Sequence, residues 1–272
     1  MDYITPILQE KQISMGTPRM VNEKVVEIYI DKVADLIDLQ DEFMVFLHPL
    51  QIDVAVLPVK NRRKKLLIAD MDSTMIKQEC IDELADYAGK KAEVSAITER
   101  AMQGELNFEE SLIQRVQTLQ GLPISTLQKC YDERIDLMDG SVELLAYMNH
   151  HKAFTALVSG GFTFFVEQVS KRLGFSAYRA NTLLSQDGKL TGKVQMPILG
   201  REAKKEALIE YAKAQNISLD DTIAVGDGAN DLSMLLTAGL GVAYHAKPAV
   251  AAQARVAIHF ADLSALKYIM GE

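Results

Sequence analysis

Three runs of apolar residues lie along the chain, and each of them ends in polar or acidic residues. The runs cover residues 66–69, 154–158 and 222–225. Short apolar runs without alternation are typical of strands that are buried on both faces of a parallel sheet. The carboxyl ends of such strands open onto a ligand crevice. The pattern therefore predicts an α/β fold built on a Rossmann-like parallel sheet, with a site where the three strands end.

The residues between the first two apolar runs show a different pattern. From about residue 76 to residue 150 the apolar positions recur at helical spacing. We expect a helical insertion over residues 76–150, within a main domain that covers residues 61–272. Farther along, an Asp-Gly pair inside residues 183–194 predicts a hairpin, and residues 201–215 predict a helix.

The first sixty residues are predicted to form a separate unit. Apolar and polar residues alternate at residues 26–30 and again at 52–56, and the residues between them, 33–47, have helical spacing. This order predicts a small N-terminal β-α-β segment over residues 1–60, joined to the main domain by a short linker.

Charge argues against a nucleic-acid partner. The chain has 29 basic and 37 acidic side chains, which gives a net charge of −8. A basic run at residues 61–65 stands alone in this acidic background, and we interpret it as a solvated linker.

Nothing in the sequence predicts a membrane span or a disulfide framework. No apolar run approaches the roughly 18 residues that a transmembrane helix needs, and the polar start Met1-Asp2-Tyr3 is unlike a secretory signal. The two cysteines, Cys80 and Cys130, have no metal-ligand spacing, so we expect reduced, partly buried thiols. A cytoplasmic location is the expectation.

The end of the first apolar run carries the strongest chemical signal. Asp70 and Asp72 are two residues apart, so on extended backbone they face one side while Met71 faces the other. Two adjacent carboxylates repel each other and require a cation, for which Mg²⁺ is the best match to an all-oxygen site. A phosphorylated substrate would complete such a site. Lys204, near the start of the 201–215 helix, could add positive charge for the phosphate, although a single helix lysine more often serves solubility.

Four segments, taken together, resemble the motifs of the haloacid dehalogenase superfamily. They are DMDST at 70–74, Ser159-Gly160, Lys204 and GDGAND at 226–231, in that order along the chain. The helical insertion after the first motif resembles the cap of one branch of that superfamily. From Leu66 onward the chain is similar to the bacterial phosphoserine phosphatase family, which implies a haloacid dehalogenase-type core with a helical cap.

The resemblance implies a role for each matching residue. Asp70 would be the nucleophile that forms an aspartyl-phosphate, and Asp72 would be the general acid and base. Mg²⁺ would be held by Asp70, the backbone carbonyl of Asp72 and Asp227, and Asp231 would support that site by orienting a metal-bound water. The residues implied to bind or cover the substrate are Glu79, Met102, Phe108, Arg115, Ser159, Gly160, Lys204 and Asn230.

Two of these residues would select the substrate. Glu79 matches the family position that binds the ammonium group of the substrate, and Arg115 matches the position that binds its carboxylate. Met102 and Phe108 match apolar residues of the family's cap. The implied reaction is Mg²⁺-dependent hydrolysis of L-phosphoserine to L-serine and phosphate, the last step of serine biosynthesis. If only their spacing in the sequence is considered, Glu79 and Arg115 are explained as surface charges, and Met102 and Phe108 are explained as helix-packing residues.

Two other functions remain open from the sequence. The chain could be a related phosphatase or phosphotransferase that acts on another small phosphomonoester. It could also be a non-catalytic sensor that binds a phosphorylated metabolite through residues 1–60. These residues are long enough for only part of an ACT-like domain, and they could instead pack on the core. We expect a monomer or a homodimer.

Overall fold

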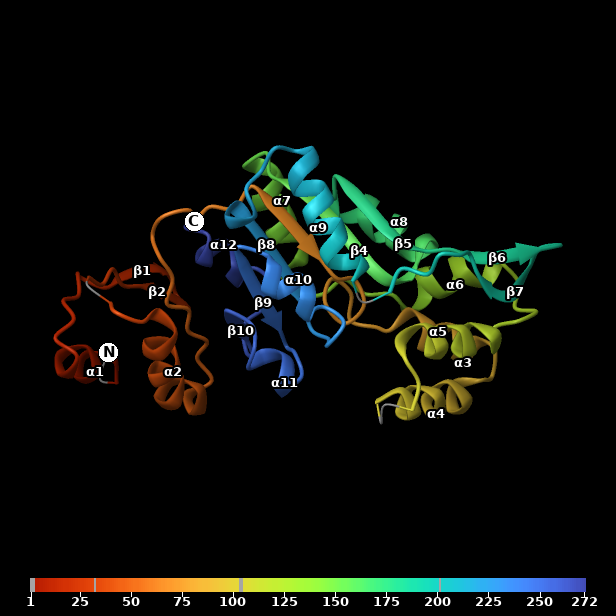
Figure 1. Ribbon diagram of the computed structural model, residues 1–272, viewed down its shortest axis with the longest axis horizontal. Coiled ribbons are helices and arrows are strands. Elements are labelled where there is room, and N and C mark those ends of the chain that lie inside the picture. The colour runs from red at the N-terminus through yellow and green to blue at the C-terminus, as the bar shows by residue number, and fades with distance from the viewer. Residues whose placement is uncertain (1–2, 32, 103–104, 201) are drawn as a thin grey trace.

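The computed structural model describes residues 3–31, 33–102, 105–200 and 202–272, without the side chain of Met102. Within these residues the central sheet has six strands, all parallel, in the order β10-β9-β8-β3-β4-β5. The three predicted strands are therefore confirmed, and they are neighbours in the sheet (Figure 1). The six strands are β3 (Leu66–Ala69), β4 (Phe154–Phe162), β5 (Ala177–Asn181), β8 (Thr222–Gly226), β9 (Leu240–Tyr244) and β10 (Val256–Ile258).

Helices cover both faces of this sheet, as the unbroken apolar strands require. Successive residues of a strand point to opposite faces, so Leu67 of β3 packs in one apolar cluster and Ile68 packs in another. The first cluster includes α7 (Ser141–His150), α8 (Thr163–Leu173) and α12 (Ala265–Ile269). The second includes α9 (Ala203–Ala214), α10 (Leu232–Thr237) and α11 (Pro248–Ala251).

The predicted helical insertion forms a cap beside the sheet. Its helices are α3 (Cys80–Tyr87), α4 (Lys91–Met102), α5 (Phe108–Gln117) and α6 (Ser125–Arg134). The cap ends earlier than the predicted residue 150: Ile76 and Leu137 pair at its base, and the following helix α7 packs on the sheet. The helical spacing of α7 continues that of the cap helices, and only its buried residues, such as Leu144, show that it belongs to the core.

The predicted hairpin is confirmed and supports the cap. Strands β6 (Leu183–Gln186) and β7 (Lys189–Val194) pair antiparallel, and both turn residues, Asp187 and Gly188, have positive φ. The backbone N–H of Gly121, which follows α5, donates to the carbonyl of Leu190 at 2.8 Å. The hairpin therefore reaches out from the core and packs against α5.

The N-terminal segment has the order α-β-β-α rather than β-α-β. Its elements are α1 (Ile4–Glu10), the antiparallel pair β1 (Arg19–Asn22) and β2 (Val25–Glu27), and α2 (Leu36–Leu47). The prediction of a strand at 52–56 is wrong, because these residues form hydrogen bonds with side chains and with the core and do not pair with another strand. The N–H of Val56 donates to the side chain of Gln40 at 3.0 Å.

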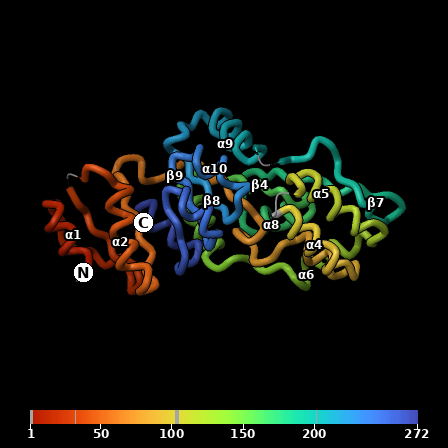
Figure 2. Tube along the Cα trace, turned by 60° about the horizontal axis from the view of Figure 1, so that its bottom comes forward, coloured from red at the N-terminus to blue at the C-terminus, as the bar shows by residue number. Residues whose placement is uncertain are grey.

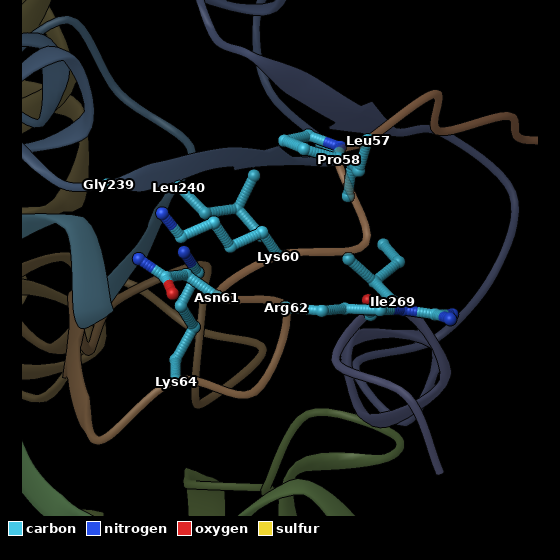
Figure 3. A pocket seen from close by; sticks show the side chains of 9 residues that line it. All are labelled: Leu57, Pro58, Lys60, Asn61, Arg62, Lys64, Gly239, Leu240 and Ile269. Atoms are coloured by element: carbon cyan, nitrogen blue, oxygen red, sulfur yellow. Dashed lines mark hydrogen bonds between the residues drawn. The ribbon is translucent and has the colours of Figure 1, made fainter. Parts of the chain in front are cut away.

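The prediction that residues 61–65 form a solvated linker is wrong, because this segment ties the N-terminal segment to the core. Arg62 donates to the carbonyls of Ile269 and Tyr268 at 2.8 and 2.6 Å and also contacts Glu27 of β2. Lys64 is buried and donates to the carbonyl of Asp220 at 2.7 Å. Figure 3 shows the crevice that this linker forms with Gly239, Leu240 and Ile269.

The N-terminal segment and the cap lie at opposite ends of the molecule, with the sheet between them (Figures 1 and 2). Cys80 and Cys130 are both free, and both are fully buried rather than partly buried as predicted. Among the residues that the structure describes, no helix is long and apolar enough to cross a bilayer.

Asp53 provides a direct test of how the N-terminal segment is held. Its carboxylate accepts hydrogen bonds from the backbone N–H groups of His259, Phe260 and Ala261, at 2.8, 3.0 and 2.9 Å. Asp53→Ala should lower the free energy of unfolding in urea by about 2 kcal/mol, because three backbone donors lose a charged acceptor. The matched control is Asp41→Ala, which removes an exposed carboxylate and should change stability by less than about 0.5 kcal/mol. Equal effects of the two variants would contradict the anchoring role of Asp53.

Candidate active site

The three polar segments predicted from the sequence meet at one edge of the sheet. Asp70 follows β3, Ser159 lies in the last part of β4, and Asp227 follows β8. These strands are adjacent and parallel, so their carboxyl ends lie together. The N–H of Asp70 donates to the carbonyl of Val225 at 3.0 Å, which keeps the first motif in register with β8.

Lys204 is buried between two carboxylates at this edge. Its ammonium lies 2.7 Å from Asp70 Oδ1 and 2.6 Å from Asp231 Oδ1, and the side chain of Asp231 is fully buried. Burial lowers the pKa of Lys204, but the carboxylates of Asp231 and Asp70 outweigh it and raise the pKa above its usual value. Lys204 is therefore a buried cation beside Asp70 and not a solvated helix lysine.

Asp231 holds the loop of the last motif together. Its Oδ2 accepts hydrogen bonds from the N–H groups of Asp227 and Gly228, at 3.1 and 2.9 Å. A Cβ atom on Gly226 would lie 2.4 Å from Asp231 Cγ, so only glycine fits at that position. Since Oδ1 faces Lys204, both oxygens of Asp231 are already in use within the protein.

Asp72 lies where the core, residues 159–161 of β4 and the cap meet. Its Oδ1 accepts from the N–H of Cys80, at the start of α3, at 2.9 Å. Its Oδ2 accepts from the hydroxyl of Ser159 at 3.2 Å, and Ser159 Oγ accepts in turn from the N–H of Gly161 at 2.8 Å. Burial raises the pKa of Asp72 above its usual value.

A cluster of three carboxylates could hold a metal ion. Within the described part of the chain, one oxygen from each of Asp70, Asp227 and Asp231 lies within 4.8 Å of the others. Burial, followed by the charge of Asp231, raises the pKa of Asp70, and the same two causes raise the pKa of Asp227 to about 6. Lys204 alone does not neutralise this cluster. An oxygen-only, negatively charged donor set fits a hard divalent cation such as Mg²⁺.

The cap adds one acidic and one basic side chain to the site. Glu79 precedes α3 and accepts a hydrogen bond from the hydroxyl of Ser73 at 2.7 Å. Burial, followed by the charge of Asp72, raises the pKa of Glu79 to about 8. Burial lowers the pKa of Arg115, and the charges of Asp82 and Glu79 oppose that shift. Among the described residues, neither Glu79 nor Arg115 has an oppositely charged partner within the 4.0 Å of a salt bridge.

The structure describes the positions of Phe108 and Asn230, but not that of the Met102 side chain. Phe108, at the start of α5, covers Gly160, since a Cβ atom on that glycine would lie 2.8 Å from Phe108 Cζ. Asn230 lies over Gly228 in the loop of the last motif. The side chain of Met102 is outside the described residues, so its predicted place over the site stays a prediction.

Sequence reasoning missed two hydroxyls that fix site carboxylates. Thr74 donates to Asp227 Oδ1 at 2.8 Å, and Ser73 donates to Glu79. Both hydroxyls follow Asp72 directly in the first motif. Their position was visible in the sequence, but their partners are not predictable without knowing how the loop turns. Ser73 itself adopts a left-handed conformation, with φ of 56°.

Comparison with known proteins gives consistent results. Residues 67–236 match the family model described as haloacid dehalogenase-like hydrolase. A phosphoserine phosphatase of Haemophilus influenzae is 44% identical over 227 residues, which are 83% of this chain and 72% of that protein. A phosphoserine phosphatase of Methanocaldococcus jannaschii is also 44% identical, over 76% of this chain and 99% of that protein.

A solved structure extends the likeness to the whole chain. The crystal structure of a haloacid dehalogenase family hydrolase from Salmonella enterica serovar Typhi has a TM-score of 0.89 and 29% identity, and the match covers 100% of this chain and 95% of the other. The site geometry, the family model and the identity to both relatives agree. The chain belongs to the haloacid dehalogenase-like hydrolases and, within them, to the phosphoserine phosphatase family.

Proposed function

We propose that this protein is a phosphoserine phosphatase that hydrolyses L-phosphoserine to L-serine and phosphate with the help of Mg²⁺. One observation, apart from family membership, supports L-phosphoserine as the substrate. Glu79 is exposed and Arg115 is half-buried, each interacts electrostatically with Asp72, and neither is in a salt bridge among the described residues. A substrate with an ammonium group, a carboxylate and a phosphate would satisfy all of these groups at once.

The reaction would run in two steps on the two aspartates of the first motif. A carboxylate oxygen of Asp70 attacks phosphorus, the bond from phosphorus to the serine oxygen breaks, and Asp72 gives its proton to that oxygen. Asp72, now deprotonated, accepts a proton from water as the water oxygen attacks the aspartyl-phosphate. This second step releases phosphate and regenerates Asp70. The hydrogen bonds from Cys80 and Ser159 hold Asp72 in place through both steps.

The proposed metal site uses Asp70, Asp227 and the backbone carbonyl of Asp72, with Asp231 supporting it through the 226–231 loop. When bound, Mg²⁺ neutralises negative charge on the phosphate and on the carboxylates. Thr74 keeps the Asp227 carboxylate oriented. The support for this assignment is the oxygen-only donor set and its excess of negative charge.

The remaining residues would bind the substrate. Ser159, the N–H of Gly160, Lys204 and Asn230 would bind the phosphate, while Phe108 and Met102 would cover it. Glu79 would pair with the ammonium group of the substrate, and Arg115 would bind its carboxylate. A role in serine biosynthesis, a cytoplasmic location and a monomeric or homodimeric state remain predictions from the sequence.

Asp70→Asn tests the nucleophile. The amide cannot attack phosphorus, so phosphate release from L-phosphoserine should fall by more than about 10³-fold while the folded state is retained. The matched control is Asp187→Asn, in the turn of the β6–β7 hairpin, where asparagine also accepts the positive φ of 52°. That control should keep the activity of the unmodified protein. Substantial turnover by Asp70→Asn would rule out Asp70 as the nucleophile.

A reciprocal pair of variants tests the substrate-reading charges. Arg115→Gln should lower kcat/KM for L-phosphoserine by about 30- to 100-fold but have little effect on phosphoethanolamine, which lacks the carboxylate. Glu79→Gln should show the opposite preference: it should weaken L-phosphoserine but have little effect on phospholactate, which lacks the ammonium group. Each variant is the control for the other. Equal losses on all three substrates would contradict the assigned roles.

Removal of the metal tests the carboxylate cluster. Chelation should abolish turnover, and added Mg²⁺ should restore it. Asp227→Asn should raise the Mg²⁺ concentration needed for half-maximal activity by about tenfold or more, because a charged donor is lost. Glu210→Gln, which changes an exposed carboxylate on α9, is the control and should leave that concentration unchanged. Full activity after chelation would contradict a metal requirement.

A further inference from the structure

Asn181 is a buried polar residue that no predicted motif includes. It is the last residue of β5, and only 2% of its surface is exposed. Its side-chain amide nitrogen donates to the carbonyl of Gly160 at 2.9 Å, and its side-chain oxygen accepts from the N–H of Leu199 at 2.7 Å. The amide therefore joins residues 159–161, near the end of β4, to the segment that leads into α9.

The contact with Leu199 fixes the orientation of the amide. A backbone N–H can only donate, so the oxygen of the Asn181 side chain must face Leu199. The nitrogen then faces Gly160, and it also lies 3.5 Å from the carbonyl of Leu199. Asn181 thus uses both ends of its side chain, as a buried amide must to offset its lost hydration.

The bond to Gly160 acts on the groups that carry out the reaction. The carbonyl of Gly160 shares a rigid peptide plane with the N–H of Gly161. That N–H donates to Ser159 Oγ at 2.8 Å, and Ser159 Oγ donates to Asp72 Oδ2 at 3.2 Å. A continuous chain of contacts therefore runs from Asn181 through residues 159–161 to the carboxylate of Asp72.

The bond to Leu199 acts on the other side of the site. Leu199 lies shortly before α9, which carries Lys204 near its start. Lys204 in turn contacts Asp70 at 2.7 Å. One side chain thus links the segments that carry Ser159 and Lys204, although these two residues are 45 positions apart in the sequence.

We propose that Asn181 is a positioning residue for phosphoryl transfer. It fixes the peptide plane between Gly160 and Gly161 and so sets the position of Ser159 and Asp72, and it does not itself touch the substrate. The proposal rests on the roles proposed above for Ser159 and Asp72. It does not depend on which phosphomonoester is the natural substrate, because the groups that it positions act on the phosphate and on the leaving oxygen.

Two variants separate the two ends of the amide. Asn181→Ala removes both hydrogen bonds. Asn181→Asp has almost the same volume and keeps the acceptor for Leu199, but its ionised form cannot donate to Gly160. The matched control is Asn149→Ala, because Asn149 also donates from its side chain to a glycine carbonyl, that of Gly174 at 3.0 Å, but lies at the end of α7 outside the site.

Steady-state kinetics on L-phosphoserine and on an aryl phosphate, both with Mg²⁺, measure the effect. Asn181→Ala should lower kcat by about 10- to 100-fold on both substrates, with KM changed by less than about threefold, because misplaced groups slow the chemical step. Asn149→Ala should stay within twofold of the unmodified protein. The fraction of folded protein, followed by circular dichroism, is used to correct each kcat.

The pH dependence of Asn181→Asp gives a readout that loss of stability does not reproduce. When protonated, the new carboxyl group can donate to the Gly160 carbonyl, and burial favours that neutral form. The kcat of Asn181→Asp relative to the unmodified protein should therefore rise as the pH falls, whereas the relative kcat of Asn181→Ala should stay flat. If Asn181→Ala does not fold, the pH profile of Asn181→Asp alone tests the proposal.

Three outcomes would overturn the proposal. They are a corrected kcat of Asn181→Ala within threefold of the unmodified protein, a change confined to KM, and a flat pH profile for Asn181→Asp. Failure of the proposed function looks different: the unmodified protein would hydrolyse the aryl phosphate but not L-phosphoserine. In that case the role of Asn181 is still measured on the aryl phosphate.

Discussion

The whole site depends on one buried ammonium group held between two buried carboxylates. Without Lys204, Asp70 and Asp231 would be unpaired charges removed from water, which is a costly arrangement. With Lys204 in place, Asp70 can stay at the end of β3, and Asp231 can use its other oxygen to hold the loop after β8. Lys204 does not balance the acidic cluster fully, and the remaining negative charge is what makes the same site suited to a cation and to phosphate chemistry.

The sheet and the core of the site were predictable because both follow from local pattern and parallel topology. The apolar run at 66–69 favours a strand buried on two faces, and the residues that follow parallel strands meet at one edge. That argument places Asp70, Ser159 and Asp227 together without any knowledge of contacts. Lys204 required the family motif as well, since a helix lysine by itself is uninformative.

What could not be predicted depends on long-range contacts between polar groups. The alternation at 52–56 is equally consistent with a strand and with an extended segment, and Gln40 and Asp53 decide between them through partners elsewhere in the fold. The linker lysine and arginine have buried partners that the charge pattern does not reveal. Asn181 is similar: nothing around it in the sequence marks it, and only its contacts with Gly160 of β4 and with Leu199 explain its burial.

The cap and the core have separate tasks, and the central claim concerns how they combine. In the proposed function the core would supply the phosphate chemistry, and Glu79 and Arg115 would recognise the amino-acid part of the substrate. The most direct measurement is kcat/KM for phosphate release from L-phosphoserine with Mg²⁺, compared with phosphothreonine, phosphocholine and an aryl phosphate. The account predicts a clear preference for L-phosphoserine over the other three. Equal or greater activity on the aryl phosphate would contradict the assignment of the cap charges, and no activity on any of the four would contradict the catalytic role of the core.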